Sequence, residues 1–346
     1  MGCMQQPVTR NLNTMSSNKK ISAGIIGGAG YTGGELIRLL LHHPYADIAF
    51  VHSNSNAGNY LYQVHEDLAG ETDLQFTGDL SLMEKGIDVL FLCVGHNQAR
   101  KFLEAHPVPA NVKVIDLSQD FRLEASSRIG DRQFTYGLPE LNREAIRTAS
   151  NIANPGCFAT CIQLGLLPLA KAGLLQQVYT TGITGSTGAG QSLTPTSHFS
   201  WRVNNIQAYK TLTHQHLKEI GQSLKQLQPQ QEVEINFVPW RGDFARGIFV
   251  SSTIHCDIEL HEVLDLYESY YEDHPFTYVS KTPVFLKQVV NTNKCIIQPE
   301  KVGTKLVIHS VTDNLLKGAS GQAVQNMNLL FGMEECAGLK LKANYF

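Results

Sequence analysis

Gly27-Gly28-Ala29-Gly30-Tyr31-Thr32-Gly33 is the stretch that decides the fold of this 346-residue chain. An apolar run at residues 21–26 precedes it, and apolar residues at helical spacing follow it, at Leu36, Ile37, Leu40 and Leu41. Strand, glycine turn and helix in this order are typical of dinucleotide binding, in which the backbone approaches a pyrophosphate at a helix N-terminus. Gly27, Gly30 and Gly33 give a GxxGxxG variant of that fingerprint. We therefore expect a dinucleotide-binding α/β domain here.

Further strands alternate with helical stretches in the first half of the chain. The apolar runs are residues 48–52, 88–94 and 112–117, and such alternation predicts a parallel sheet. Ligands of these sheets lie beyond the C-terminal ends of the strands, where His96 and Arg122 fall. His96 either contacts the cofactor or is a bystander in its loop.

The end of the second strand indicates which dinucleotide is bound. Enzymes that use NAD usually carry Asp or Glu there, to bind the ribose 2′-hydroxyl. This chain has Ser53-Asn54-Ser55-Asn56 instead, and hydroxyl and amide groups fit a 2′-phosphate better than an acid does. We expect NADP as the cofactor, with Ser53 and Ser55 among its ligands.

A cysteine stands where a second helix is predicted to begin. Asn154-Pro155-Gly156 favours a turn, and the apolar run 158–167 continues as a helix, so Cys157 falls in its first turn. The free N–H groups and the helix dipole at that position favour a thiolate and could hold an oxyanion. The alternative is a buried structural cysteine.

The second half of the chain has a different pattern of apolar and β-branched residues. β-branched and alternating segments predict a mixed or antiparallel sheet, with strands at residues 180–184, 232–238, 247–256 and 305–310. Helices are expected at residues 163–172, 214–226, 260–271 and 321–331. The loop 185–190, which contains Gly188, is either a flexible connector or a backbone segment that lies close to a ligand.

Composition excludes several classes of protein. Hydrophobic residues make up 42% of the chain, charged residues 17%, and the net charge is −3, so nucleic acid is not an expected partner. No apolar run approaches the length of a membrane span. Seven scattered cysteines without paired spacing suggest neither disulfides nor a metal site, and favour the cytoplasm. Residues 1–20 are expected to form a disordered leader.

Taken together, these stretches resemble the N-acetyl-γ-glutamyl-phosphate reductases of arginine biosynthesis, within the wider aspartate-semialdehyde dehydrogenase group. The similarity spans nearly the whole chain after the leader. It is carried by residues 27–36, 115–122, 136–140, 153–157, 188–190, 214–220 and 313–328. The segment around Cys157 and the last of these runs are the most specific parts.

The resemblance implies a Rossmann domain, residues 21–154 plus 313–346, and an α+β substrate and dimerisation domain, residues 155–312, in a homodimer or homotetramer. It implies NADPH-dependent reduction of an acyl phosphate to a semialdehyde through a thioester on Cys157. A histidine would serve as acid and base. We favour His216 over His214, two residues away and expected on the opposite side of the helix.

The resemblance also implies ligands for substrate and cofactor. Arg122, Arg241 and Arg246 are candidates to bind the phosphate and carboxylate of the substrate, because a guanidinium offers paired donors to either group. Glu219 would orient the substrate or the histidine. The remaining cofactor contacts implied are Tyr31, Thr32, Gly188 and Asn314.

The chain departs from the family pattern at three places. The stretch between Arg122 and Tyr136 is short, Asn54 stands where a basic residue is common, and Trp240-Arg241-Gly242-Asp243 replaces a histidine-containing sequence. The additional arginine could bind a second carboxylate, so an N-succinyl substrate is a hypothesis beside the N-acetyl one. The remaining alternatives are an aspartyl or carrier-linked aminoadipyl phosphate, a dinucleotide sensor without turnover, and a cysteine hydrolase.

Overall fold

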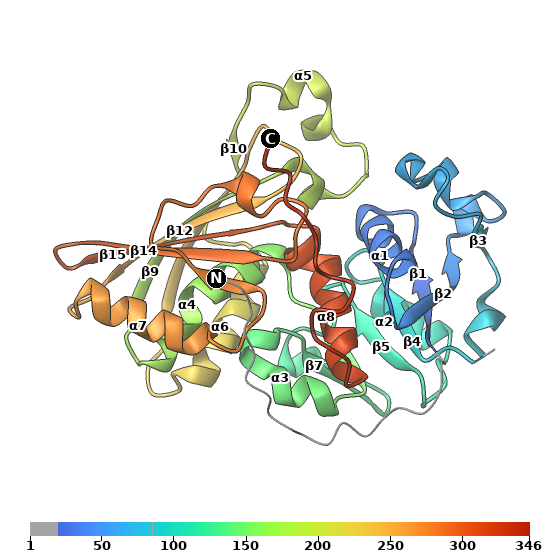
Figure 1. Ribbon diagram of the computed structural model, residues 1–346, viewed down its shortest axis with the longest axis horizontal. Helices are drawn as coiled ribbons and strands as arrows, with labels where there is room; N and C mark the ends of the chain where they lie inside the picture. The colour runs from blue at the N-terminus through green and yellow to red at the C-terminus, as the bar shows by residue number, and fades with distance from the viewer. Residues whose placement is uncertain (1–19, 85) are drawn as a thin grey trace.

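Two sheets organise the chain (Figure 1). The computed structural model describes residues 20–84 and 86–346. The expected leader, residues 1–20, lies outside the described residues apart from Lys20. Among the helices within the described ranges, none is long and apolar enough to cross a bilayer.

The first sheet has eight strands in the order β3-β2-β1-β4-β5-β8-β7-β6. Its strands are β1 (Ile21–Ile26), β2 (Ala46–His52), β3 (Phe76–Thr77), β4 (Val89–Leu92), β5 (Lys113–Asp116), β6 (Arg128–Ile129), β7 (Arg132–Tyr136) and β8 (Asn151–Ala153). All neighbours pair in parallel except β6 and β7, so the predicted parallel sheet is confirmed. Its helices are α1 (Tyr31–Leu41), α2 (Ala99–Ala105) and α3 (Pro139–Thr148).

The second sheet has seven strands in the order β10-β11-β9-β12-β15-β14-β13. They are β9 (Gln177–Thr184), β10 (Gln207–Ala208), β11 (Glu234–Arg241), β12 (Ile248–His255), β13 (Thr277–Val279), β14 (Cys295–Val302) and β15 (Lys305–Thr312). The sheet is mixed, as expected, because β9–β11 and β13–β14 pair in parallel and the others antiparallel. Strand β14 was not expected from the sequence.

Helices α4 (Cys157–Lys171), α6 (His216–Leu227) and α7 (Leu260–Tyr271) lie on one side of this second sheet, below it in Figure 1. The short helix α5 (Phe199–Arg202) belongs to a loop that projects above the sheet. Helix α4 continues through Pro168, which has no N–H to donate to the carbonyl of Leu164. The hydroxyl of Tyr271 donates to that carbonyl instead, so the helix that begins with Cys157 stays unbroken.

The last helix returns to the first sheet. Helix α8 (Gly321–Leu330) buries Ala323, Val324 and Met327 in the same core as Ile25 and Leu36. Because β8 ends at residue 153 and β15 at residue 312, we infer two folding units, residues 21–154 with 313–346 and residues 155–312. The junctions between these units are where the candidate site lies.

Candidate active site

Cys157 is the first residue of α4 and follows Gly156, whose backbone is extended. No side chain caps this helix start, so its first N–H groups remain free for a ligand. The preceding turn is fixed by Asn154, whose amide donates to the carbonyl of Ala319 and whose oxygen accepts from Asn326. Both of those partners lie near the C-terminus of the chain, so the segment that returns to the first sheet also holds the turn before Cys157.

Glycines allow other groups to approach this cysteine. A Cβ on Gly156 would lie 2.3 Å from Nε2 of His216, and one on Gly318 would lie 2.8 Å from Cβ of Cys157. Gly318 belongs to a π-helical turn, Leu316–Ser320, between β15 and α8. The imidazole and this turn therefore close on the cysteine from two sides, which no larger residue at either position would allow.

Glu219 lies at the centre of the hydrogen bonds around the turn. It is 3% exposed. Its carboxylate accepts from Arg122 at 3.1 Å, from the hydroxyl of Tyr136 at 2.8 Å and from the N–H of Gly156 at 3.1 Å. The sequence suggested that Glu219 orients the substrate or the histidine, and these bonds engage both of its oxygens with the protein. Its position suits holding the cysteine turn and the imidazole, because Nε2 of His216 is 3.8 Å away.

The sequence suggested that the two candidate histidines lie on opposite sides of a helix, but the structure places them side by side. Helix α6 begins only at His216, and His214 precedes it, so their ring centroids are 4.5 Å apart. Nδ1 of His214 accepts from the backbone N–H of His216, and its ring packs edge-on against Phe158 and Phe237. His214 thus supports the start of the helix, while His216 faces the cysteine turn.

The sequence led us to expect a thiolate at Cys157, but the pKa of this cysteine is raised. Burial raises the pKa of its thiol to about 11, although N–H groups at the helix start and the charge of Arg122 act in the opposite direction. Burial, assisted by Arg122 and His214, lowers the pKa of His216 well below its usual value. In this state the pair is a neutral thiol beside a neutral imidazole, which suits transfer of the thiol proton to His216 at the moment of reaction.

Alkylation of Cys157 by iodoacetamide is expected to accelerate about tenfold per pH unit from about pH 7 to about pH 10, because only the thiolate reacts. Mass spectrometry of the peptide that contains Cys157 would give the rate at each pH. A plateau reached below about pH 8 would instead show a preformed thiolate paired with a charged imidazole.

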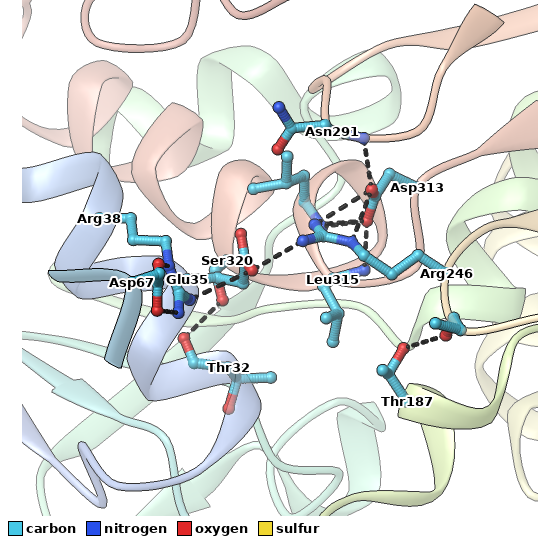
Figure 2. A network of polar contacts seen from close by, with 12 residues as sticks. Thr32, Glu35, Arg38, Asp67, Thr187, Arg246, Asn291, Asp313, Leu315 and Ser320 are labelled. Carbon is cyan, nitrogen blue, oxygen red and sulfur yellow. Dashed lines mark hydrogen bonds and ion pairs between the residues drawn. The ribbon is translucent and has the colours of Figure 1, made fainter. Parts of the chain in front are cut away.

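Two of the three arginine candidates are already engaged. Arg122 is 5% exposed and donates through all three guanidinium nitrogens, to the carbonyls of Asn154 and Leu117 and to Glu219. Figure 2 shows Arg246 between Asp313 and Glu35, with contacts of 2.7 to 3.1 Å. Arg246 therefore links α1 to the second unit, and its ion pairs leave it less available to substrate than the sequence suggested.

Arg241 is the third candidate, at the end of β11. Its guanidinium lies 5.1 Å from the ring centroid of Tyr209 and contacts Oγ1 of Thr196 at 3.5 Å. Within the part of the chain that the structure describes, Arg241 forms no ion pair with a carboxylate. Burial raises the pKa of Tyr209, and a thiolate at Cys157 would raise it further, which places Tyr209 and Arg241 on the side of the cysteine.

The glycine turn has the geometry that a dinucleotide requires. Gly27 has a φ of +79°, and a Cβ on it would lie 2.5 Å from the carbonyl oxygen of Cys93. A Cβ on Gly33 would lie 2.7 Å from the backbone of Gly28. Gly30 precedes the first residue of α1, where neither a side-chain cap nor an acid in the first turn competes for the free N–H groups. Tyr31 and Thr32 form that first turn, so these residues fit a pyrophosphate.

The other predicted cofactor residues fall into two groups. Ser53 is buried at the end of β2, Ser55 is exposed, and the amide of Asn56 donates to both hydroxyls. Asn314 donates to Thr187 and accepts from the N–H of Gly247, and a Cβ on Gly188 would lie 3.9 Å from its amide nitrogen. The structure thus brings Gly188 and Asn314 together, apart from the serines.

Sequence reasoning missed several groups at this site. Lys210 and Tyr209 lie in the segment before His214. Neither belongs to a recognisable motif, so the sequence did not indicate a role for them. Lys317 and Glu140 could have been noticed, since each stands in a stretch that carries the family resemblance. Their side chains form a buried ion pair of 2.7 Å beneath the π-helical turn.

Two family models match this chain. The model "Semialdehyde dehydrogenase, NAD binding domain" matches residues 22–149, and "Semialdehyde dehydrogenase, dimerisation domain" matches residues 157–314. The N-acetyl-gamma-glutamyl-phosphate reductases of Parabacteroides distasonis and Bacteroides thetaiotaomicron are each 58% identical to this chain over 327 residues. Those residues are 94% of this chain and 100% of each relative.

A solved structure shares the fold. The crystal structure of aspartate semialdehyde dehydrogenase II from Vibrio cholerae, complexed with ASA, superimposes with a TM-score of 0.69. The match covers 91% of this chain and 99% of that one, at 18% identity. At this level of identity the likeness establishes the architecture of both units and nothing about the substrate.

Proposed function

The chain belongs to the semialdehyde dehydrogenase family, among its N-acetyl-γ-glutamyl-phosphate reductases, and from this membership we propose that it reduces N-acetyl-γ-glutamyl phosphate to N-acetylglutamate 5-semialdehyde with NADPH. The observation that carries the proposal is Cys157 at a helix start, with the imidazole of His216 packed on the adjacent Gly156. The reaction belongs to arginine biosynthesis. A thiol beside a neutral base is the arrangement that thioester chemistry needs.

His216 and Cys157 perform the first half of the reaction. The neutral imidazole takes the thiol proton, and the thiolate attacks the acyl carbon of the substrate. The bond from that carbon to the phosphate oxygen breaks, and phosphate leaves with the electron pair. N–H groups at the start of α4 are placed to bind the oxyanion that forms during attack. The product of this half is a thioester on Cys157.

The second half releases the aldehyde. When bound, NADPH supplies the hydride that reduces the thioester carbon. The resulting thiohemiacetal collapses, the bond from carbon to sulfur breaks, and the sulfur recovers its proton from the imidazolium of His216. Glu219 stabilises that imidazolium from 3.8 Å and holds the Gly156 amide throughout.

The reverse direction tests this function. We expect the protein to reduce NADP⁺ with N-acetylglutamate semialdehyde, with a rate that depends on inorganic phosphate. Formation of NADPH would be followed by absorbance, with phosphate omitted as the control. Tight NADPH binding without turnover would instead support a dinucleotide sensor.

An N-succinyl substrate is the second candidate, and Arg241 favours it. Its guanidinium has no carboxylate partner among the described residues. Burial lowers the pKa of Arg202, which donates to the carbonyl of Gly242, and the charge of Arg241 lowers it further. Two neighbouring cations suit a second carboxylate on the acyl group. An assay in which the N-acetyl and N-succinyl semialdehydes compete tests this candidate. A strong preference for the N-acetyl form would exclude the N-succinyl substrate.

We propose that the protein is a homodimer or homotetramer assembled through the second sheet. The face opposite α4 and α7 leaves Tyr179 and Thr181 of β9 exposed, with Tyr179 at 54%. The matched model is itself described as a dimerisation domain. A monomer by light scattering at micromolar concentration would contradict this assembly. Cys93, Cys157, Cys161, Cys256 and Cys295 form no disulfide, which supports a cytoplasmic location.

A further inference from the structure

The proposed reaction requires a cation beside Cys157 to bind the phosphate that leaves. Arg122 and Arg246 donate all their guanidinium nitrogens to groups of the protein. Arg241 has no carboxylate partner among the described residues, but it lies with Tyr209 and Arg202, and we assign it to the acyl group. A cation with more open donors on the side of His216 is therefore the better candidate for the phosphate.

Lys210 has the properties required. It has a φ of +45°, a conformation that non-glycine residues rarely adopt and that is concentrated at functional sites. Its ammonium donates to Oε1 of Gln215 at 2.8 Å, and Gln215 directly precedes His216. The carbonyl of Lys210 accepts from the N–H of Thr213, which fixes the turn. Among the described residues, no carboxylate lies within ion-pair distance of this ammonium.

The surroundings of His216 place Lys210 on the side of the imidazole. Arg122 and Lys210 act on His216 with positive charge and add to the effect of burial in lowering its pKa, as His214 and His96 do when they are protonated, while Glu219 faces it with negative charge. Nδ1 of His216 is buried and has no hydrogen-bond partner in the described structure. An unpartnered buried nitrogen indicates a polar ligand at the imidazole, and the contact between Lys210 and Gln215 brings the ammonium to the start of the same helix.

We propose that Lys210 binds the phosphate group of the acyl phosphate and stabilises the charge on that phosphate as it leaves. The proposal rests on the proposed function, and it assigns the phosphate to Lys210 and the acyl group to Arg241. As sulfur bonds to the acyl carbon and the bond to the phosphate oxygen breaks, the ammonium keeps its proton and pairs with the departing oxygens. The strained backbone holds the ammonium at that position before substrate arrives.

The test compares Lys210→Met, Lys210→Arg and Lys225→Met in the phosphate-dependent reverse reaction. Lys225 is an exposed lysine of α6 and serves as the matched control. We expect Lys210→Met to raise the KM for inorganic phosphate by about 10- to 100-fold, the range for a lost hydrogen bond to a charged group, with little change in the KM for NADP⁺. Lys210→Arg should recover part of the loss, and Lys225→Met should match the native protein.

A second readout separates failure of this proposal from failure of the proposed function. Inorganic phosphate should protect Cys157 from iodoacetamide in the native protein and not in Lys210→Met, whichever acyl group the protein accepts. The acid limb of kcat/KM should also move to higher pH in Lys210→Met, because His216 loses a positive neighbour. An unchanged phosphate KM together with unchanged protection would overturn the assignment of Lys210, even if the native protein turns over.

Discussion

Replacing Cys157 with serine is expected to lower the phosphate-dependent turnover by about 1,000-fold or more, because a serine hydroxyl beside His216 is a far weaker nucleophile than a thiolate. The steady-state rate of NADP⁺ reduction measures the loss. Binding of NADPH should be unchanged, since the glycine turn at residues 27–33 is built from a different part of the chain. Tight cofactor binding without turnover is the result that identifies the nucleophile.

A matched control separates the chemistry of Cys157 from the packing of α4. Cys161 lies one turn further along the helix, fully buried, and donates to the carbonyl of Ser310. A serine there keeps a donor of similar size, so Cys161→Ser should retain most of the activity. If Cys157→Ser kept more than about a tenth of the native rate, the thioester mechanism would be wrong.

Lys317→Met is expected to lower the free energy of unfolding by about 3–5 kcal/mol, the cost of removing one partner from a buried ion pair. Lys317 is 0% exposed, and its ammonium contacts Glu140 at 2.7 Å and Gln325 at 2.9 Å. Methionine fills a similar volume but leaves the carboxylate of Glu140 buried without its cation. Urea denaturation at neutral pH measures the loss.

The pH dependence of the loss identifies its cause. In the native protein, burial acts to raise the pKa of Glu140, but Lys317 outweighs burial and the pKa is lowered. Without the lysine, burial should raise the pKa of this carboxyl above its unfolded value, so protonation would favour the folded state. The deficit of Lys317→Met should therefore shrink as the pH falls from about 7 to about 5.

The double variant Glu140→Gln/Lys317→Met supplies the control for this pair. It removes both charges, and it should recover much of the stability that the single change loses. Two outcomes would contradict the explanation that Lys317→Met leaves a buried charge unpaired. One is a loss of unfolding free energy below about 1 kcal/mol in Lys317→Met, and the other is a double variant less stable than Lys317→Met.

Local patterns predicted the parts of the fold that depend on neighbouring residues. Helix α7 was predicted at residues 260–271 and has those bounds, and the glycine turn at residues 27–33 joins strand to helix as expected. Strand β14 was missed because Pro299 argues against a strand, yet the residue pairs with Ile308 in the sheet. Tertiary pairing outweighed the local signal there.

The candidate site was only partly predictable, because its side chains depend on partners far away in sequence. Arg122 and Arg246 were reasonable anion ligands from residue type alone, but Glu219 and Asp313 engage them from 97 and 67 residues away. The buried state of Cys157, which raises its pKa, also follows from packing and not from its place at a helix start. The sequence predicted Cys157 as the candidate nucleophile, whereas its protonation state follows from the fold.

The return of α8 to the first sheet has a consequence for synthesis of the chain. Ile25 and Leu36 leave the ribosome early, but Ala323 and Met327, which complete their core, emerge some 300 residues later. The nascent first domain therefore exposes apolar surface until the whole second domain has been synthesised. A chain stopped before residue 321 would keep that surface open, which makes premature termination an aggregation hazard and chaperone protection valuable during translation.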